Sequence, residues 1–312
     1  MRPTSNSSII ICSIVRDAER GLKRNIPQIK ALCDNFKDFK VFVYENDSKD
    51  NTKKLLEKWC KSDPTHVFIS LNKTNNAVRT IPSVSESGDV NPFYSRKRIE
   101  KMANLRNAYM EFIDAEGWKA DYLMVVDLDV AWIRADNILS SFEKDNWDAV
   151  TAYGYSLSPK LKWRYHDSYA LTELGDENYP QTENKIKMLS EKYAKLSTYD
   201  KWIRVYSAFG GLAIYRFECV KGLRYDTLGN NDKRVEVKCE HFSIYRKMAE
   251  RGFYKVYINP KMVLKYQDLT IGIVWNSLSR MLRNLIGGGK GFEIECYPCV
   301  AFMVEPNCKC VA

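Results

Sequence analysis

The chain has 312 residues, a length typical of one large domain or two small ones, and 45% of them are hydrophobic, which excludes an intrinsically disordered chain. The formal net charge of +9 suits a nucleotide, a nucleic acid or an acidic membrane, but dispersed lysines also suit a solvated surface. Every apolar run is shorter than the ~18 residues that cross a bilayer, so we expect no transmembrane segment.

The first half of the chain alternates strand and helix patterns. The expected strands are 9–15, 39–45, 66–70, 121–127 and 148–154, and the expected helices lie near 18–34, 50–61, 95–116 and 136–143. This rhythm predicts an α/β fold with a mainly parallel central sheet and helices on both faces. Ligands of such sheets bind beyond the carboxyl ends of the strands, so the loops 16–20, 45–52 and 127–130 are expected to meet there.

The second half has a less regular pattern. It contains an excursion at 155–202 that we expect to cover the site, a Gly-Gly segment at 204–216, a helix near 240–251, a strand at 253–260, a helix near 271–285 and a turn at 287–289. In the first half, a polar loop is expected at 72–94. No clear linker divides the chain. We expect a nucleotide-binding half at 1–155, an acceptor-binding half of the same domain at 156–268, and a C-terminal helix and tail at 269–312.

The nine cysteines form two groups. Five are scattered through expected strands and helices, like small buried apolar residues, which favours a cytosolic protein. The other four are Cys296, Cys299, Cys308 and Cys310. Their irregular spacing leaves zinc binding, disulfide pairing and free thiols all open. We therefore expect a cytoplasmic protein, or the soluble catalytic domain of an anchored one.

The segment 45-ENDSKDNT-52 joins an expected strand to an expected helix. Ser48 or Asp50 is expected to cap the helix that follows, because a side-chain oxygen there satisfies a free N–H group. Capping does not explain Glu45 and Asn46, which lie where a base or a ribose can be hydrogen-bonded.

The expected helix at 95–113 carries two arginines on its apolar side. At 100° per residue, Arg98 and Arg106 fall within the stripe of buried positions. A buried arginine needs a partner, because a lone buried charge is costly. That partner is a core carboxylate or, as we favour for Arg106, the diphosphate of a ligand; for Arg98, snorkelling at the stripe's edge is equally compatible.

Asp127 and Asp129 follow the apolar strand 122-YLMVV-126. Alternation along a strand puts both carboxylates on the same side. Like charges this close raise a pKa unless a cation is present, and a hard divalent ion that bridges carboxylates to phosphates resolves the repulsion. The sequence therefore predicts a site for Mn²⁺ or Mg²⁺. Asp129 is expected as the direct ligand, and Asp127 as a second ligand or a contact to the sugar or ribose.

Glu240 and His241 begin an expected helix. Glu240 either favours the helix dipole or, if partly buried, acts as a base toward a hydroxyl group. His241 is either a further metal ligand or acceptor contact, or a histidine satisfied within the core.

These motifs, in this order, resemble the GT-A nucleotide-sugar glycosyltransferases, and more closely the fungal capsule-associated mannosyltransferase type with its viral and bacterial relatives. The motifs are 45-ENDSKDNT-52, Arg106-Asn107, 127-DLD-129, 165-YHDSYAL-171, 207-SAFGGLAIYR-216, 239-CEHF-242 and 258-INPKMVLKY-266. The resemblance spans about residues 9 to 266. It implies a GT-A (Rossmann-like) fold and transfer of a hexosyl or pentosyl unit from a UDP- or GDP-sugar to a hydroxyl of a glycan or glycoprotein, with Mn²⁺ or Mg²⁺.

The resemblance also implies roles for matching residues. Donor contacts are expected from Arg16, Asp17, Glu45, Asn46, Asp47, Arg98, Arg106, Asp127, Leu128, Gly210 and Gly211. Metal contacts are expected from Asp129 and Asp127, catalytic roles for Glu240, Asp127 and His241, and acceptor contacts from Asp167 and Glu240. Glu240-His241 replaces the family's usual Glu-Asp pair, so both an inverting reaction with Glu240 as base and a retaining one without a base stay open.

Two other functions compete with this prediction. A sugar-nucleotide nucleotidyltransferase shares the sheet and the paired acids, but normally has a glycine-rich phosphate loop after its first strand; 16-RDAERGLKR-24 has one glycine. A non-enzymatic nucleic-acid-binding protein needs a basic or aromatic surface and has no use for Asp127, Asp129 and Glu240 in one cleft. We therefore expect no nucleic-acid partner.

Overall fold

The structure, a computed structural model, describes residues 4–71, 89–158, 162–199 and 201–267. The expected helix at 271–285, the turn at 287–289, the four C-terminal cysteines and most of the polar loop at 72–94 lie outside the described residues. The expected division of the chain at 155 and 268 stays a prediction.

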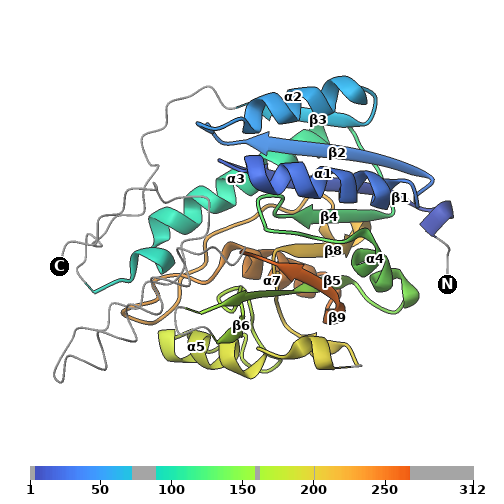
Figure 1. Cartoon of the computed structure of the whole chain (residues 1–312). Coiled ribbons are helices and arrows are strands. Elements are labelled where there is room, and N and C mark those ends of the chain that lie inside the picture. The colour runs from blue at the N-terminus through green and yellow to red at the C-terminus, as the bar shows by residue number, and fades with distance from the viewer. Residues whose placement is uncertain (1–3, 72–88, 159–161, 200, 268–312) are drawn as a thin grey trace.

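A single mixed sheet forms the centre of the described chain (Figure 1). Its strands are β1 Ser8–Val15, β2 Asp38–Glu45, β3 Val67–Leu71, β4 Tyr122–Val126, β5 Ala149–Leu157, β6 Trp163–Tyr165, β7 Ile203–Val205, β8 Leu212–Arg216 and β9 Val256–Lys265. They are ordered β3-β2-β1-β4-β8-β5-β9-β7, with β6 beside β5. The strands β3, β2, β1, β4, β5 and β9 share one direction, and β8, β6 and β7 oppose it.

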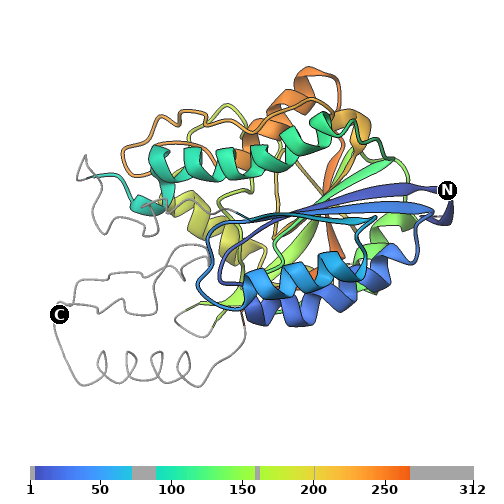
Figure 2. The same cartoon turned by 90° about the horizontal axis from the view of Figure 1, so that it is seen from above.

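Helices cover both faces of the sheet (Figure 2). They are α1 Glu19–Cys33, α2 Thr52–Ser62, α3 Arg96–Ala115, α4 Ala135–Leu139, α5 Glu183–Lys192, α6 Phe217–Val220 and α7 Glu240–Glu250, with 3-10 turns η1 Thr4–Asn6, η2 Pro92–Tyr94, η3 Ser140–Glu143 and η4 Leu196–Thr198. Helices α1 and α2 lie on one face, and α3 and α7 on the other. The expected mainly parallel α/β fold is thus confirmed.

Two hydrophobic clusters hold these layers together, one on each face of the sheet. Alternate residues of β1 divide between them: Ile9 and Ile11 pack with α1 and α2, whereas Ile10 and Cys12 pack with α3 and α7. Strands buried on both faces read as continuous apolar runs, which explains why the sequence predicted β1 and β4 so closely.

Two elements differ from the expected ones in extent or type. β9 runs from Val256 to Lys265, beyond the expected end at 260, because it continues along β5 past an irregularity in register at Ala152 and Tyr153. The expected helix at 136–143 is α4 followed by the 3-10 turn η3. Within the excursion 155–202, β6 and α5 pack against each other and contribute to the cavity described next.

Candidate active site

The loops after β1 and β2 are tied to each other at the carboxyl edge of the sheet. Asp17 and Asp47 both have positive φ, 49° and 57°, a conformation that costs energy for residues other than glycine. The Ser48 hydroxyl accepts a hydrogen bond from Asp17 N at 2.9 Å, and Asp17 Oδ1 accepts one from Lys49 N at 2.7 Å. These reciprocal bonds join Asp17 to the two residues that follow Asp47, and so connect the two loops.

Of the two residues expected to cap the following helix, Ser48 does not, because its hydroxyl accepts a hydrogen bond from the loop after β1. Thr52 Oγ1 accepts from Ala18 N at 2.7 Å, and Asp50 Oδ2 from Glu19 N at 3.0 Å, so this motif satisfies the start of α1. Asp50 also accepts from Thr52 N at 2.9 Å, and to that extent it caps α2 as expected. The segment 45–52 therefore connects the loop after β2 to the loop after β1 by hydrogen bonds.

Glu45 is the last residue of β2, Asn46 follows it, and both are buried. Glu45 Oε1 accepts a hydrogen bond from Ser48 N, and its Oε2 lies 3.9 Å from Lys53 Nζ. Lys53 Nζ also lies 3.5 Å from Asp47 Oδ1. The structure thus gathers Glu45, Asn46 and Asp47 at the expected edge, where Glu45 is already engaged within the chain.

Helix α1 packs closely against the loop that carries Asp129. The sequence pattern did not predict this contact. Asn25 is fully buried, and its Nδ2 donates to Leu128 O at 3.0 Å and Val130 O at 2.9 Å. Its Oδ1 accepts from Ile133 N at 3.2 Å. A Cβ on Gly21 would lie 2.4 Å from Leu128 O, so a glycine is needed for this approach. The Leu128 side chain is buried in the apolar cluster, and its carbonyl is bonded to Asn25, so its backbone contributes to the loop's shape.

Arg106, Glu240 and Asp127 form a buried charged network between α3, α7 and the end of β4. Arg106 Nε donates to Glu240 Oε1 at 2.9 Å, and its Nη2 lies 3.7 Å from Asp127 Oδ1. All three residues are at most 5% exposed. Of the two partners considered for Arg106, the structure shows the core carboxylates. Arg106 Nη1 and Asp127 Oδ1 have no hydrogen-bond partner within the described chain.

The carboxylates of this region respond differently to their surroundings. Burial raises the pKa of Asp127 to about 7, assisted by the charges of Asp129 and Glu240 and opposed by Arg106. Burial also raises the pKa of Asp129 to about 7. Burial raises the pKa of Glu240 too, but His241 and Arg106 outweigh it and lower the pKa to about 2. Burial and the charge of Arg106 keep the pKa of His241 well below its usual value, and the charge of Glu240 opposes this shift.

Asp167 approaches the same region from the turn after β6. Its Oδ2 accepts a hydrogen bond from Gly210 N at 3.2 Å. Burial raises the pKa of Asp167 to about 7, helped by the charges of Asp127 and Glu240. Gly210 and Gly211 have φ of 64° and 86°, and a Cβ on Gly210 would lie 2.2 Å from Ala152 O. Gly211 O accepts a hydrogen bond from Asp127 N at 2.9 Å. The Gly-Gly pair is therefore hydrogen-bonded to both Asp167 and Asp127.

Two aromatic stacks support the charged network. The His241 ring stacks on Phe209 with centroids 3.8 Å apart, and the Arg106 guanidinium lies 4.9 Å from the Phe209 ring centre. The Tyr266 ring stacks on His166 at 3.7 Å, and its hydroxyl donates to Asp127 Oδ2 at 3.5 Å. Tyr266 and His166 were not predicted, although both lie in segments of the family resemblance.

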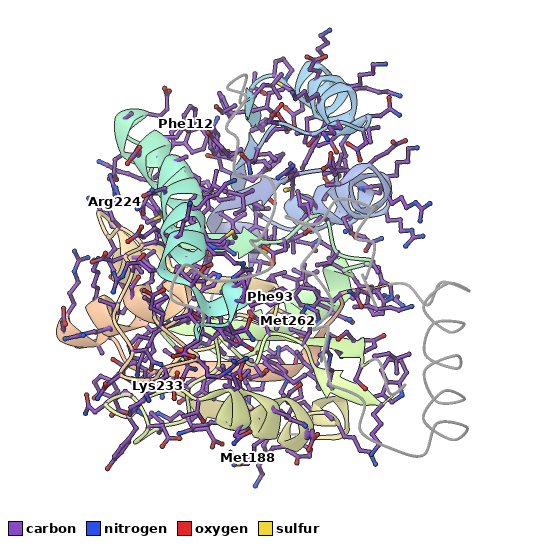
Figure 3. The ribbon with its side chains drawn as sticks, turned by 90° about the vertical axis from the view of Figure 1, so that its left-hand side faces the viewer. Phe93, Phe112, Met188, Arg224, Lys233 and Met262 are labelled. Carbon is purple, nitrogen blue, oxygen red and sulfur yellow. The ribbon has the colours of Figure 1, made fainter. Side chains whose placement is uncertain are left out.

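One cavity brings six of the expected site residues together. It is lined by Arg98, Arg106, Asp127, Asp167, Glu240 and His241. Its lining also includes Tyr266, His166, Arg164, Phe93, Tyr94, Met102 and Tyr169. Phe93, one of the lining residues, lies just before the start of α3 (Figure 3). Arg16, Asp17, Glu45, Asn46, Asp47, Leu128, Asp129, Gly210 and Gly211 do not line it. The last two contact its acids, and the others lie in the loops at the strand ends.

The acids after β4 fit a hard divalent ion in chemistry and charge. Asp127 keeps an unpartnered buried oxygen, and Asp129 is half-buried in the adjoining turn. Within the described residues, no group of three or more His, Cys, Asp or Glu side chains is arranged to hold a metal ion. A cation here would therefore take one or two carboxylates from the chain and its other ligands from phosphate and water, as Mg²⁺ commonly does.

The family model for Cryptococcal mannosyltransferase 1 matches residues 8–244 of this chain. The match covers more than half of the sequence, and the chain belongs to this family. The resemblance to the fungal capsule-associated mannosyltransferases is thus confirmed. A search of the curated proteins finds no match.

Three solved structures illustrate the proteins to which the fold of this chain is similar. The mannosyltransferase PcManGT of Pyrobaculum calidifontis, in complex with GDP-Man and Mn²⁺, is 12% identical with a TM-score of 0.47; 93% of this chain and 68% of that one are covered. TarS 1–349 of S. aureus with UDP-GlcNAc is 12% identical with a TM-score of 0.43, covering 84% and 60%. GalNAc-T7 with UDP, GalNAc and Mn²⁺ is 13% identical with a TM-score of 0.42, covering 86% and 45%.

Within residues 4–71, 89–158, 162–199 and 201–267, no helix has the length and apolar content to cross a membrane.

Proposed function

We propose that this chain is a metal-dependent glycosyltransferase. It moves a hexosyl or pentosyl unit from a UDP- or GDP-sugar to a hydroxyl group of a glycan or glycoprotein. The family match carries the proposal, because residues 8–244 contain the entire acid cluster of Asp127, Asp129, Asp167 and Glu240. The motif order and the cavity at the carboxyl edge of the sheet support it, since this edge is where open α/β sheets bind ligands.

In this proposal the loops after β1 and β2 hold the nucleoside. The hydrogen bonds that join Asp17 to Ser48 and Lys49 support this role, because they fix the two loops relative to each other before a ligand binds. Arg16, Asp17, Glu45, Asn46 and Asp47 are the proposed contacts to base and ribose. The side chains of Thr52 and Asp50 accept hydrogen bonds from Ala18 N and Glu19 N at the start of α1, which keeps these loops in position.

Asp129 and Asp127 are the proposed ligands of Mn²⁺ or Mg²⁺, which supplies positive charge against the diphosphate leaving group. Arg106 lines the cavity, and its unpartnered Nη1 is suited to a phosphate or donor-sugar oxygen. Arg98 lines the same cavity and is proposed as a further donor contact. Gly210 and Gly211 shape the backbone beneath the donor sugar, and Asp167, Glu240 and His241 lie on the proposed acceptor side.

A nucleotidyltransferase is less well supported by the structure. The one glycine after β1, Gly21, lies inside α1 and packs on the backbone of Leu128 and Asp129. It therefore serves helix packing, whereas a phosphate loop requires glycines whose N–H groups face the ligand.

Release of nucleoside diphosphate from a panel of UDP- and GDP-sugars tests the proposal. We expect release with Mn²⁺ or Mg²⁺, none in excess EDTA, and a loss of at least ~100-fold in Asp129→Ala. Asp136→Ala is the matched control, because Asp136 is an exposed acid on the neighbouring α4. Full activity in Asp129→Ala would overturn the metal assignment. Salt-sensitive binding of oligonucleotides, with no binding of sugar nucleotides, would overturn the proposed function.

A further inference from the structure

Two carboxylates on the proposed acceptor side of the cavity differ in their availability. Glu240 is 4% exposed and has both oxygens engaged: Oε1 accepts from Arg106 Nε at 2.9 Å, and Oε2 accepts from Cys239 Sγ at 3.3 Å. Asp167 is half-buried and lines the cavity. Its Oδ2 accepts from Gly210 N, whereas no described residue donates to Oδ1. Of these two carboxylates, only Asp167 therefore presents a free oxygen to a ligand.

The ion pair with Arg106 further restricts Glu240. A proton placed on Glu240 would neutralise the carboxylate that balances a buried guanidinium, and an unbalanced buried charge is costly. The same proton on Asp167 breaks no ion pair, because no described cation lies within salt-bridge distance of it. Proton acceptance during a reaction is therefore easier at Asp167.

The backbone around Asp167 is fixed on both sides. His166 N donates to Gly154 O at 2.9 Å, and Ala170 N donates to Asp167 O at 3.2 Å. The His166 ring is held by Ser156 Oγ at 2.8 Å and by the stack on Tyr266. A carboxylate on a backbone held in this way is already in position before a substrate binds. A general base must be positioned in this way to accept a proton.

We propose that Asp167 contacts the acceptor hydroxyl and takes its proton, and that Glu240 acts as a positioning residue for Arg106. This inference rests on the proposed glycosyl transfer. In the step, the acceptor oxygen forms a bond to the anomeric carbon, and the bond from that carbon to the diphosphate oxygen breaks. The electron pair leaves with the nucleoside diphosphate, and the hydroxyl proton moves to Asp167 Oδ1.

The test compares two nucleophiles, using the sugar nucleotide that the wild-type protein hydrolyses fastest with Mn²⁺. Water must lose a proton when it attacks, whereas azide has none to lose. We expect Asp167→Asn to lower the rate of hydrolysis by ~100-fold or more. Its KM for the donor should change less than about threefold, and azide should restore nucleoside diphosphate release to within about tenfold of the wild-type rate with azide.

Glu240→Gln is expected to behave differently, because its defect is in the placement of Arg106. Its KM for the donor should rise, its melting temperature should fall, and azide should not restore its rate. Asp176→Asn is the matched control: Asp176 lies in the same excursion, pairs with Lys185 at 2.6 Å, and does not line the cavity. It should keep wild-type hydrolysis.

Three results would overturn the inference. These are hydrolysis by Asp167→Asn within threefold of wild type, loss of donor binding together with hydrolysis, and azide rescue of Glu240→Gln in place of Asp167→Asn. Failure of the proposed function is distinguishable, because the wild-type protein itself would then release no nucleoside diphosphate from any donor, and the inference would fall with it.

Discussion

At the scale of single residues, Arg106 is the charge on which the centre of the site depends. It lies between Glu240 and Asp127 and packs on Phe209. Removing one member of a buried ion pair is strongly destabilising, because the remaining charge stays buried without a partner. We expect Arg106→Met to lower the free energy of unfolding by ~3–5 kcal/mol, measured by urea denaturation.

A double-mutant cycle separates the ion pair from the loss of packing. Arg106→Met combined with Glu240→Met replaces both charges with apolar side chains of similar size, so part of the lost stability should return. The coupling free energy should exceed ~1 kcal/mol. Strictly additive losses in the double variant would show that the pair contributes through packing alone.

At the scale of elements, the close approach of α1 to the loop after β4 holds Asp129 in place. A Cβ on Gly21 would lie 2.4 Å from Leu128 O and 2.7 Å from the Asp129 Cα, and backbone atoms cannot move aside cheaply. Alanine normally stabilises a helix interior by ~1 kcal/mol relative to glycine. Here we expect Gly21→Ala to destabilise the protein by ~1–3 kcal/mol and to weaken Mn²⁺ binding, measured by denaturation and by calorimetry.

Gly229→Ala is the matched control for this prediction. A Cβ there would meet a single atom, Arg96 Nη2, at 3.9 Å, so its effect on stability should stay within ~0.5 kcal/mol. Equal effects of the two substitutions, or a more stable Gly21→Ala, would contradict a tight contact between α1 and the Asp129 loop.

The elements were more predictable than the contacts between them. Strands β1, β2 and β4 were found within about one residue, because apolar runs and helix periodicity are local signals, and the parallel-sheet rule then placed their loops together. Asn25 bonds residues more than 100 positions away, and in the sequence it is only a polar residue in a helix. Ser48 was misassigned for the same reason, since the donor it satisfies belongs to another loop.

The side-chain partners within the site were partly predictable. The helical stripe placed Arg106 on the buried side of α3, but the pattern could not choose between a ligand phosphate and a core carboxylate. Glu240 lies 134 positions from Arg106, so no local pattern pairs them. The supporting hydroxyl of Tyr266 was detectable only through the family resemblance that includes the segment 258–266.

At the scale of the whole molecule, one region concentrates acidic groups in a protein whose formal net charge is +9. The pKa values of Asp127, Asp129 and Asp167 are each raised to about 7, chiefly by burial. Between the ordinary pKa of an aspartate and this raised value, the folded protein binds more protons than the unfolded chain. Stability therefore falls as the pH rises through this window.

We expect the melting temperature in EDTA to be lower at about pH 8 than at about pH 5, by ~3 °C or more if the acids contribute ~1 kcal/mol. Saturating Mn²⁺ binds the ionised carboxylates of the folded state, so it should raise the melting temperature more at the higher pH and flatten the dependence. Asp127→Asn removes one of the titrating groups and should flatten the dependence in EDTA without metal. Two results would contradict this prediction: a melting temperature in EDTA that rises from about pH 5 to about pH 8, or the same pH dependence in Asp127→Asn as in the wild type. Either result would show that the ionised acids do not destabilise the folded protein, and that a cation is not needed to offset their charge.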